Sequence, residues 1–145
     1  MLLTAAVGTP LASLPLIKQA DTIEVWFAGR ADFGTEQRRT GDNHFRIARW
    51  DTARPGDCSI KEAQIIIRRD GVGNFAARVK SKDDGDRYCV ILNLVDHSRV
   101  NVWRSSKICT PFELSDGFSS WMDTSLSFPK TQYRFIAFAT REDYC

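Results

Sequence analysis

The stretch that most constrains this chain runs from Gly56 to Arg104 and reads as four β-strands separated by three polar turns. Within it, Phe75, Ala77 and Val79 alternate with more polar residues, a period of two that is typical of a strand with one buried face. Gly71 precedes this strand in a tight turn, where glycine supplies a positive φ without steric cost. Four consecutive strands at this spacing predict a β-meander, as part of either a sandwich or an up-and-down barrel.

Similar alternation predicts strands on both sides of the central stretch. The expected strands cover residues 22–30, 44–51, 63–69, 74–80, 88–95, 100–103 and 132–140. Residues 31–43 and 105–130 lack this alternation and are expected to form loops, with a short helix near Phe118–Met122 capped by Ser115 or Asp116. The sequence therefore predicts an all-β, mostly antiparallel, disulfide-stapled single domain over residues 21–145.

Residues 1–20 form an apolar, almost uncharged segment ahead of this domain. They resemble the hydrophobic and cleavage parts of a secretory signal, but a positively charged start is missing. The alternative is an extended arm, because Pro10 and Pro15 oppose a regular helix. Nothing in the sequence approaches the roughly 20 apolar residues that a membrane-spanning helix needs.

Composition sets few limits on function. The chain has 145 residues, enough for one domain with a sizeable core, and its 43% hydrophobic and 26% charged residues are ordinary for a globular protein. A net charge of +2 is too small to indicate nucleic-acid binding by itself. We expect no nucleic-acid partner and no cofactor.

Four cysteines without a CxxC pair favour two disulfides over a zinc site. Four cysteines allow three connectivities, and we favour Cys58–Cys145 with Cys89–Cys109, since the first bond would hold the C-terminal strand beside the start of the central stretch. Disulfides indicate a secreted or periplasmic protein, whereas four free thiols would indicate a cytosolic one.

A set of turn motifs gives the chain a family resemblance. The residues that carry it are Phe45, Trp50, Asp51, Gly56, Asp57, Cys58, Asp70, Gly71, Phe75, Val79, Ser81, Asp83, Asp84, Asp86 and Cys145. In this pattern the chain resembles a family of small exported bacterial β-rich domains of unknown function. The resemblance implies an exported β-domain, supports the Cys58–Cys145 pairing and makes the other two cysteines an extra pair. It implies no activity.

The turn that contains Asp83, Asp84 and Asp86 is a weak candidate for Ca²⁺ binding, because closely spaced carboxylates supply hard oxygen ligands. The distal glutamate of a calcium hand is absent, however. Aspartate is also common in solvated hairpin turns for its backbone geometry, and we therefore expect no metal.

A second candidate site centres on His44, which lies near Arg38, Arg39 and Asp42. Small phosphodiesterases and nucleases use such groups as acid, base and phosphate clamp. The alternative is that His44 is a polar residue at a strand edge. No nucleophile elbow, phosphate-binding glycine loop or HExxH motif occurs.

Aromatic residues supply a third candidate. Trp121, with Phe118 and Phe128, would form an exposed recognition surface if the serine-rich segment around them were a loop. Tryptophan also buries a large area, so the alternative is that these side chains lie in the core.

These features predict a non-enzymatic exported binding module that presents residues 31–43 and 105–130 to a partner protein or a surface glycan. Binding would depend on the loop aromatics and on Arg38 and Arg39. Two alternatives remain: a small toxin or nuclease-like enzyme centred on His44, and an inhibitor or immunity protein that blocks a partner enzyme. Replacing His44 by alanine would abolish activity only in the enzyme.

Overall fold

The computed structural model describes residues 25–39, 41 and 44–145, which form ten strands and one 3-10 helix. The elements are β1 (Trp26–Asp32), β2 (Gln37–Arg38), β3 (His44–Arg49), β4 (Cys58–Arg68), β5 (Val72–Ser81), β6 (Cys89–Asp96), β7 (Asn101–Arg104), β8 (Ile108–Cys109), β9 (Ser119–Ser127), η2 (Lys130–Phe135) and β10 (Ile136–Tyr144). The N-terminal segment 1–20 and the residue Asp42 lie outside the described part of the chain.

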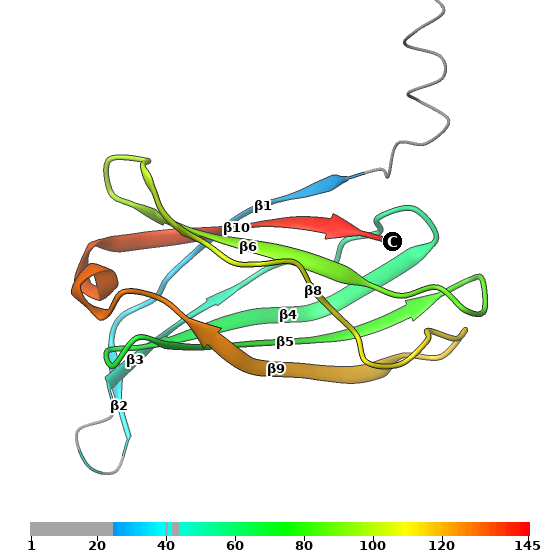
Figure 1. The fold of residues 1–145 in the computed structure, drawn as a ribbon, viewed down its shortest axis with the longest axis horizontal. Coiled ribbons are helices and arrows are strands. Elements are labelled where there is room, and N and C mark those ends of the chain that lie inside the picture. The colour runs from blue at the N-terminus through cyan, green and yellow to red at the C-terminus, as the bar shows by residue number, and fades with distance from the viewer. Residues whose placement is uncertain (1–24, 40, 42–43) are drawn as a thin grey trace, which may run out of the picture.

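The strands form two antiparallel sheets stacked as two layers (Figure 1). Sheet I has the order β1-β10-β6-β7, and β8 also pairs with β6. Sheet II has the order β2-β3-β4-β5-β9. The predicted all-β, antiparallel class is confirmed, and the two sheets make a sandwich rather than a closed barrel. The layers meet at one edge, where Phe33 forms an isolated bridge with Ala48.

The prediction of a four-strand meander is wrong for its last two strands. The β4–β5 hairpin forms as expected, but β6 and β7 belong to sheet I, and β5 pairs on its free side with β9. The turn after β5 carries the chain across to the other layer. Strand β6 then lies centrally between β10 and the β7–β8 edge, which explains why it is apolar on both faces.

Both segments expected to be loops contain strands, and the expected helix near residue 118 is absent because β9 occupies it. Trp121 and Leu126 of β9 both point into the core although five positions separate them. A register irregularity between β5 and β9 permits this odd spacing, and it also hides the period of two from sequence inspection. Helix η2 replaces the first part of the expected last strand.

The core lies between the sheets and contains aromatic side chains from both of them. Phe75 of β5 and Tyr88, which precedes β6, each contact the ring of Trp121 edge-on with 5.8 Å between ring centroids. Edge-to-face contacts of this kind add to the stabilisation that burial of the rings supplies. The aromatic contacts therefore tie β9 into the sandwich.

Two disulfides form with the predicted pairing. Cys58 begins β4 of sheet II and Cys145 follows β10 of sheet I, so their bond joins the two layers at one end of the sandwich. Cys89 and Cys109 are cross-strand partners within sheet I, and their bond holds the short strand β8 on β6.

Candidate functional site

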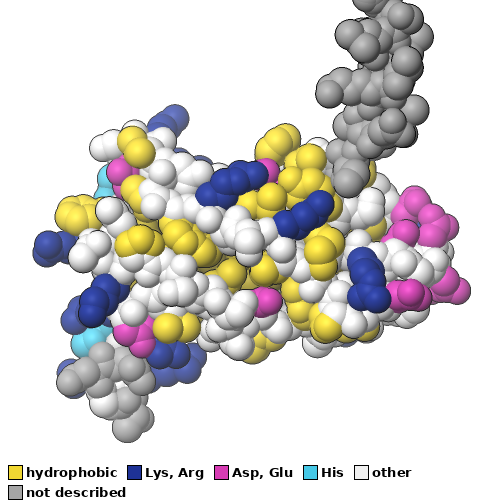
Figure 2. Space-filling view, in the orientation of Figure 1, with side chains coloured by type: hydrophobic (Ala, Val, Ile, Leu, Met, Phe, Trp, Pro, Cys, Tyr) yellow, Lys and Arg dark blue, Asp and Glu magenta, His cyan; other side chains and the backbone are white. Residues whose placement is uncertain are grey.

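A pocket of about 690 Å³ opens at the end of the sandwich that carries η2 and the β2–β3 hairpin. Its lining, called here the basic pocket, consists of Glu36, Arg46, Arg69, Lys130, Thr131, Tyr133 and Arg134. Four cationic side chains and one carboxylate thus surround the cavity. In Figure 2 lysine and arginine side chains gather at this end of the molecule, while aspartate and glutamate gather at the opposite end.

Arg46 of β3 fixes the wall of the basic pocket. Its guanidinium donates to the backbone oxygen of Ile136 at 2.8 Å and to that of Tyr133 at 2.5 Å, and it also lies 5.0 Å from the centre of the Tyr133 ring. These bonds reach one carbonyl group in η2, which also accepts from the backbone N–H of Ile136, and one at the first residue of β10. Arg46 therefore holds η2 against sheet II.

Glu36 and Arg69 form an ion pair on one side of the pocket, with 2.7 Å between Oε1 and Nη2. The Tyr133 hydroxyl is the largest cause that lowers the pKa of Glu36 from its ordinary value of 4.5. Burial opposes this shift, and the Arg69 guanidinium lowers the pKa further. Glu36 is therefore ionised at neutral pH and neutralises much of the charge of Arg69.

Tyr133 lies beneath the pocket and is only 4% exposed. Its hydroxyl makes no hydrogen bond of ordinary geometry, although the Glu36 carboxylate lies close enough to act on it. Burial and then Glu36 raise the pKa of Tyr133 to about 12, so the phenol stays neutral. A buried hydroxyl without a well-formed hydrogen bond carries a desolvation cost, and a ligand that accepts a hydrogen bond from it would remove that cost.

Lys130 and Arg134 complete the pocket at its rim. Both side chains are exposed, and neither forms an ion pair with another described residue. Arg134 stacks on the ring of Phe135 with 5.2 Å between Cζ and the ring centroid, which restricts its rotation. Two available cations above a buried hydroxyl are suited to bind a carboxylate, sulfate or phosphate group.

Three of the residues proposed around this candidate site, Arg38, Arg39 and His44, lie at the same end of the molecule but do not line the pocket. Arg38 and His44 are cross-strand partners of β2 and β3, and Arg39 stacks on Phe45 at 4.7 Å. Asp42 lies outside the described residues. The structure therefore brings Arg38 and His44 together, and the proposal of a catalytic role for them stays a prediction.

Sequence reasoning missed most of the basic pocket because its residues come from three distant segments. Lys130, Tyr133 and Arg134 were expected in a loop end and a strand, yet η2 turns them toward Glu36 and Arg69. The one local signal is Pro129, which lies at the end of the expected loop and immediately precedes η2.

The expected aromatic surface is wrong for two of its three members. Trp121 is 6% and Phe128 is 5% exposed, and both pack in the core. Their segment was read as a loop, whereas strand β9 directs Trp121 inward and Phe128 packs against Trp103. Phe118 alone lies half-buried at the surface.

The acidic turn differs in composition from the predicted set. Carboxylates of Asp57, Asp83 and Asp86 offer atoms within 4.8 Å of one another, whereas Asp84 is not part of this group. Asp86 accepts a hydrogen bond from Ser81 at 2.6 Å. Asp57, through a hydrogen bond and charge repulsion, raises the pKa of Asp83. This cluster marks the acidic end of the molecule, and nothing besides its carboxylates indicates an ion.

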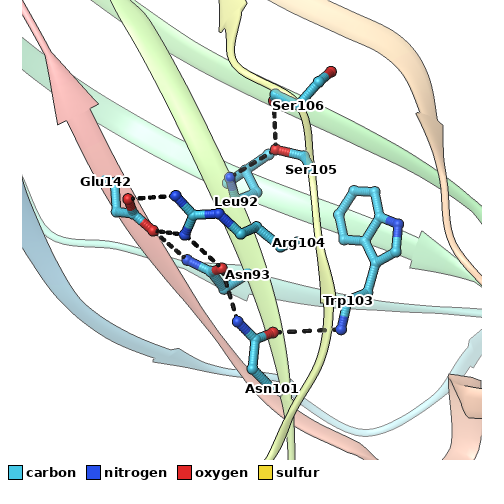
Figure 3. A network of polar contacts seen from close by, with 8 residues as sticks. All are labelled: Leu92, Asn93, Asn101, Trp103, Arg104, Ser105, Ser106 and Glu142. Carbon is cyan, nitrogen blue, oxygen red and sulfur yellow. Dashed lines mark hydrogen bonds and ion pairs between the residues drawn. The ribbon is translucent and has the colours of Figure 1, made fainter.

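A polar network covers the outer face of sheet I (Figure 3). Arg104 of β7 pairs with both carboxylate oxygens of Glu142 on β10. Asn93 of β6 lies between them: it donates to Glu142 at 2.9 Å and accepts from Asn101 at 2.9 Å. These groups satisfy one another's hydrogen-bonding capacity, and the network holds the edge strand β7 on the sheet.

The chain belongs to a family of unknown function (DUF6294), which matches residues 64–145, more than half of the sequence. The match contains the Asp70-Gly71 turn, the acidic turn and Cys145, while the motifs around Trp50 and Cys58 precede it. The expectation of an uncharacterised family is thereby confirmed. No curated protein and no solved structure shows significant similarity to the chain. No helix among the described residues is long and apolar enough to cross a membrane.

Proposed function

We propose that this protein is an exported, non-enzymatic binding module that captures an anionic group of a partner protein or a surface glycan in its basic pocket. The observation that carries the proposal is that Lys130 and Arg134, neither paired with an acid among the described residues, line the same pocket as Tyr133, whose hydroxyl is buried. Charged donors beside a neutral donor can bind two oxygens of a carboxylate, sulfate or phosphate at once.

The electrostatics of the pocket support anion binding rather than cation binding. Its single carboxylate, Glu36, is already paired with Arg69. Arg46 is held by backbone oxygens, so it contributes positive potential without moving. A pre-ordered wall lowers the entropy that a ligand must lose on binding.

The disulfides support export, and the position of the basic pocket supports the predicted binding segments. The disulfides join distant segments, one of them across the two layers, and structural disulfides persist in oxidising compartments. The basic pocket also draws on both segments proposed to present the binding surface, since Glu36 belongs to residues 31–43 and Lys130 ends residues 105–130.

The test is binding of small anions, measured by NMR of backbone amides and arginine Nε–H groups. N-acetylglutamate represents a protein carboxylate, and glucuronate represents a glycan carboxylate. We expect saturable shifts confined to residues 130–135 and their neighbours. The double variant K130Q/R134Q should bind at least about tenfold more weakly, since hydrogen bonds between charged groups contribute roughly 1.5–3 kcal/mol each.

A matched control removes the same charge elsewhere. Lys82 adjoins the acidic turn and Lys107 stacks on Tyr144, both outside the pocket lining. The variant K82Q/K107Q should bind as the wild type does. Equal binding by all three proteins, or shifts spread over the whole surface, would refute the pocket as the site.

The variant Y133F tests whether the Tyr133 hydroxyl contributes to anion binding, apart from any contribution to the stability of the fold. Because its hydroxyl has only a poorly aligned contact with Glu36 in the free protein, its removal should change the free energy of unfolding by less than about 1 kcal/mol while weakening anion binding. An enzyme centred on His44 would behave differently. It would turn over a phosphodiester substrate and lose that activity in H44A, an outcome that would replace the present proposal.

A further inference from the structure

We propose that the outer face of sheet II carries a second binding site, separate from the basic pocket, for an acidic polysaccharide whose charges alternate with neutral sugars. The site is built around Phe118, which immediately precedes β9. It extends along a shallow groove across β4, β5 and β9.

Three cations surround the ring of Phe118. The Nζ atoms of Lys61 and Lys80 lie 4.1 and 5.0 Å from the ring centroid, and the Cζ atom of Arg78 lies 5.7 Å from it. Each contact is an attractive cation–π interaction that restrains a long side chain. The ring therefore gathers three positive charges in one place on the surface.

The strand register makes this gathering of charge costly for the free protein. Lys61 of β4 lies directly opposite Arg78 of β5, and like charges at opposed positions destabilise a sheet. The neighbouring carboxylate is that of Glu62, which lies 3.9 Å from Arg78, is 66% exposed and thus offsets little of the repulsion. An anionic group bound over Phe118 would relieve it.

The groove beside this cluster has a different chemistry. It encloses about 460 Å³, and its lining is Glu62, Gln64, Ala76, Ala77, Arg78, Ser120, Trp121 and Met122. Gln64 and Ser120 can donate and accept hydrogen bonds, Glu62 accepts them, and the 61% exposed Met122 offers apolar contact. Sugar rings present both hydroxyl groups and apolar faces, so this lining suits them.

Arg78 lies over the ring of Phe118 and also lines the groove, so it joins the cluster of cations to the groove. A ligand that follows the strands would place an anionic group near Phe118 and a neutral, hydroxyl-bearing unit beside Glu62. A uniformly charged polymer fits less well, because Glu62 would repel its next anionic group. This is the reason for choosing an alternating acidic polysaccharide over a nucleic acid or an anionic membrane.

The test measures binding of a fluorescently labelled hyaluronan octasaccharide, which carries one carboxylate per two sugars. We expect binding that weakens with salt, and at least about a tenfold loss in K61Q/K80Q, where two charge-assisted contacts are removed. The comparison is repeated in the K130Q/R134Q background, which removes glucuronate binding in the basic pocket, and the loss caused by K61Q/K80Q should persist there. The two proposals therefore fail or hold independently.

Glu62 provides a variant that distinguishes the classes of ligand. E62Q keeps an acceptor oxygen and removes a negative charge, so it should strengthen binding of a single-stranded DNA 20-mer, whose next phosphate lies near residue 62, more than binding of hyaluronan, which places a neutral sugar there. Far-UV circular dichroism and a thermal unfolding curve check that each variant folds.

Several outcomes would overturn the inference. These are undetectable hyaluronan binding, equal binding by wild type and K61Q/K80Q, and tighter binding of the DNA 20-mer or of vesicles with 30% phosphatidylserine than of the octasaccharide. A loss of hyaluronan binding in K130Q/R134Q alone would instead assign the glycan to the basic pocket.

Discussion

Arg141 and Asp143 form an ion pair that is sealed inside the sandwich. The Nε–Oδ1 and Nη2–Oδ2 distances are 2.8 and 3.0 Å, and the side chains are 0% and 1% exposed. Two positions apart on β10, they share the inward face of the strand. Tyr88 donates a third hydrogen bond to Asp143 at 2.6 Å, and the ring of Trp50 lies 5.0 Å from Arg141 Cζ. Burial is the main reason that the pKa of Tyr88 lies well above its ordinary value.

The first prediction concerns this pair. D143N should destabilise the protein by about 3–5 kcal/mol, because it leaves the Arg141 charge buried without its counter-ion. The double variant R141M/D143L should lose much less, since no unpaired charge remains. Urea unfolding monitored by tryptophan fluorescence measures both. If the double variant is as unstable as D143N, the cost comes from packing and not from the unpaired charge.

The second prediction concerns pH and the network on sheet I. Arg104, followed by Asn93, lowers the pKa of Glu142 in the folded protein below its ordinary value of 4.5. The ionised carboxylate therefore contributes stability above the unfolded-state pKa, and this contribution is lost as pH falls through the folded-state pKa. E142Q should be less stable than wild type at neutral pH by up to about 1 kcal/mol, because Arg104 is half exposed.

The same comparison at acid pH checks the sign. The difference in stability between wild type and E142Q should shrink as pH falls below the folded-state pKa of Glu142, as measured by urea unfolding at a series of pH values. A difference that stays constant across the series would mean that the charge of Glu142 plays no part.

The third prediction ranks the two disulfides. Cys58–Cys145 closes a sequence separation of 87 residues, and Cys89–Cys109 closes one of 20. Since the longer loop removes more entropy from the unfolded chain, C58S/C145S should lose about 1 kcal/mol more stability than C89S/C109S. Thermal and urea unfolding of the two double variants test this order. The reverse order would show that native contacts at Cys89–Cys109 outweigh loop entropy.

The fourth prediction concerns Gly71, in the turn between β4 and β5. Its φ is +91°, and a Cβ atom there would lie 2.6 Å from the backbone oxygen of Phe128. Gly85 has a similar φ of +92°, but a Cβ atom there would meet only Glu113 Oε1 at 3.9 Å, an ordinary contact. G85A should therefore cost only the left-handed backbone penalty of roughly 1–2 kcal/mol, and G71A clearly more.

G71A should also disturb the basic pocket. The clash pushes on Phe128 and Lys130, which lead into η2, so anion binding should weaken in G71A and not in G85A. Unfolding curves together with the N-acetylglutamate titration measure both effects. Equal stability of the two variants would contradict the close approach of the Gly71 turn to Phe128.

The local pattern of apolar and polar residues predicted most strands correctly. The alternation of Phe75, Ala77 and Val79 marks β5, and the apolar run of β6 marks a central strand, because burial on one or two faces leaves a direct trace in residue order. It failed at β9, where a register irregularity breaks the period between Trp121 and Leu126. Cysteine spacing led to the observed disulfides.

The candidate sites were harder to predict. The predicted histidine group is local in sequence, and the structure does bring Arg38 and His44 together. The basic pocket, in contrast, unites Glu36, Arg69 and the η2 residues from three segments, and no short motif links them. The cations around Phe118 likewise come from β4 and β5, while the ring precedes β9.

The amino-acid sequence by itself determined the β class and the positions of most strands and turns, and it favoured one of three possible cysteine pairings, the one that forms. Only the tertiary structure decided that β6 leaves sheet II, that β9 joins it beside β5, and that Lys130, Tyr133 and Arg134 face Glu36. The physical reason is one of range. Side-chain alternation reflects which face of a strand is buried, a property of neighbouring residues, whereas strand partners and pockets depend on how distant segments share one core.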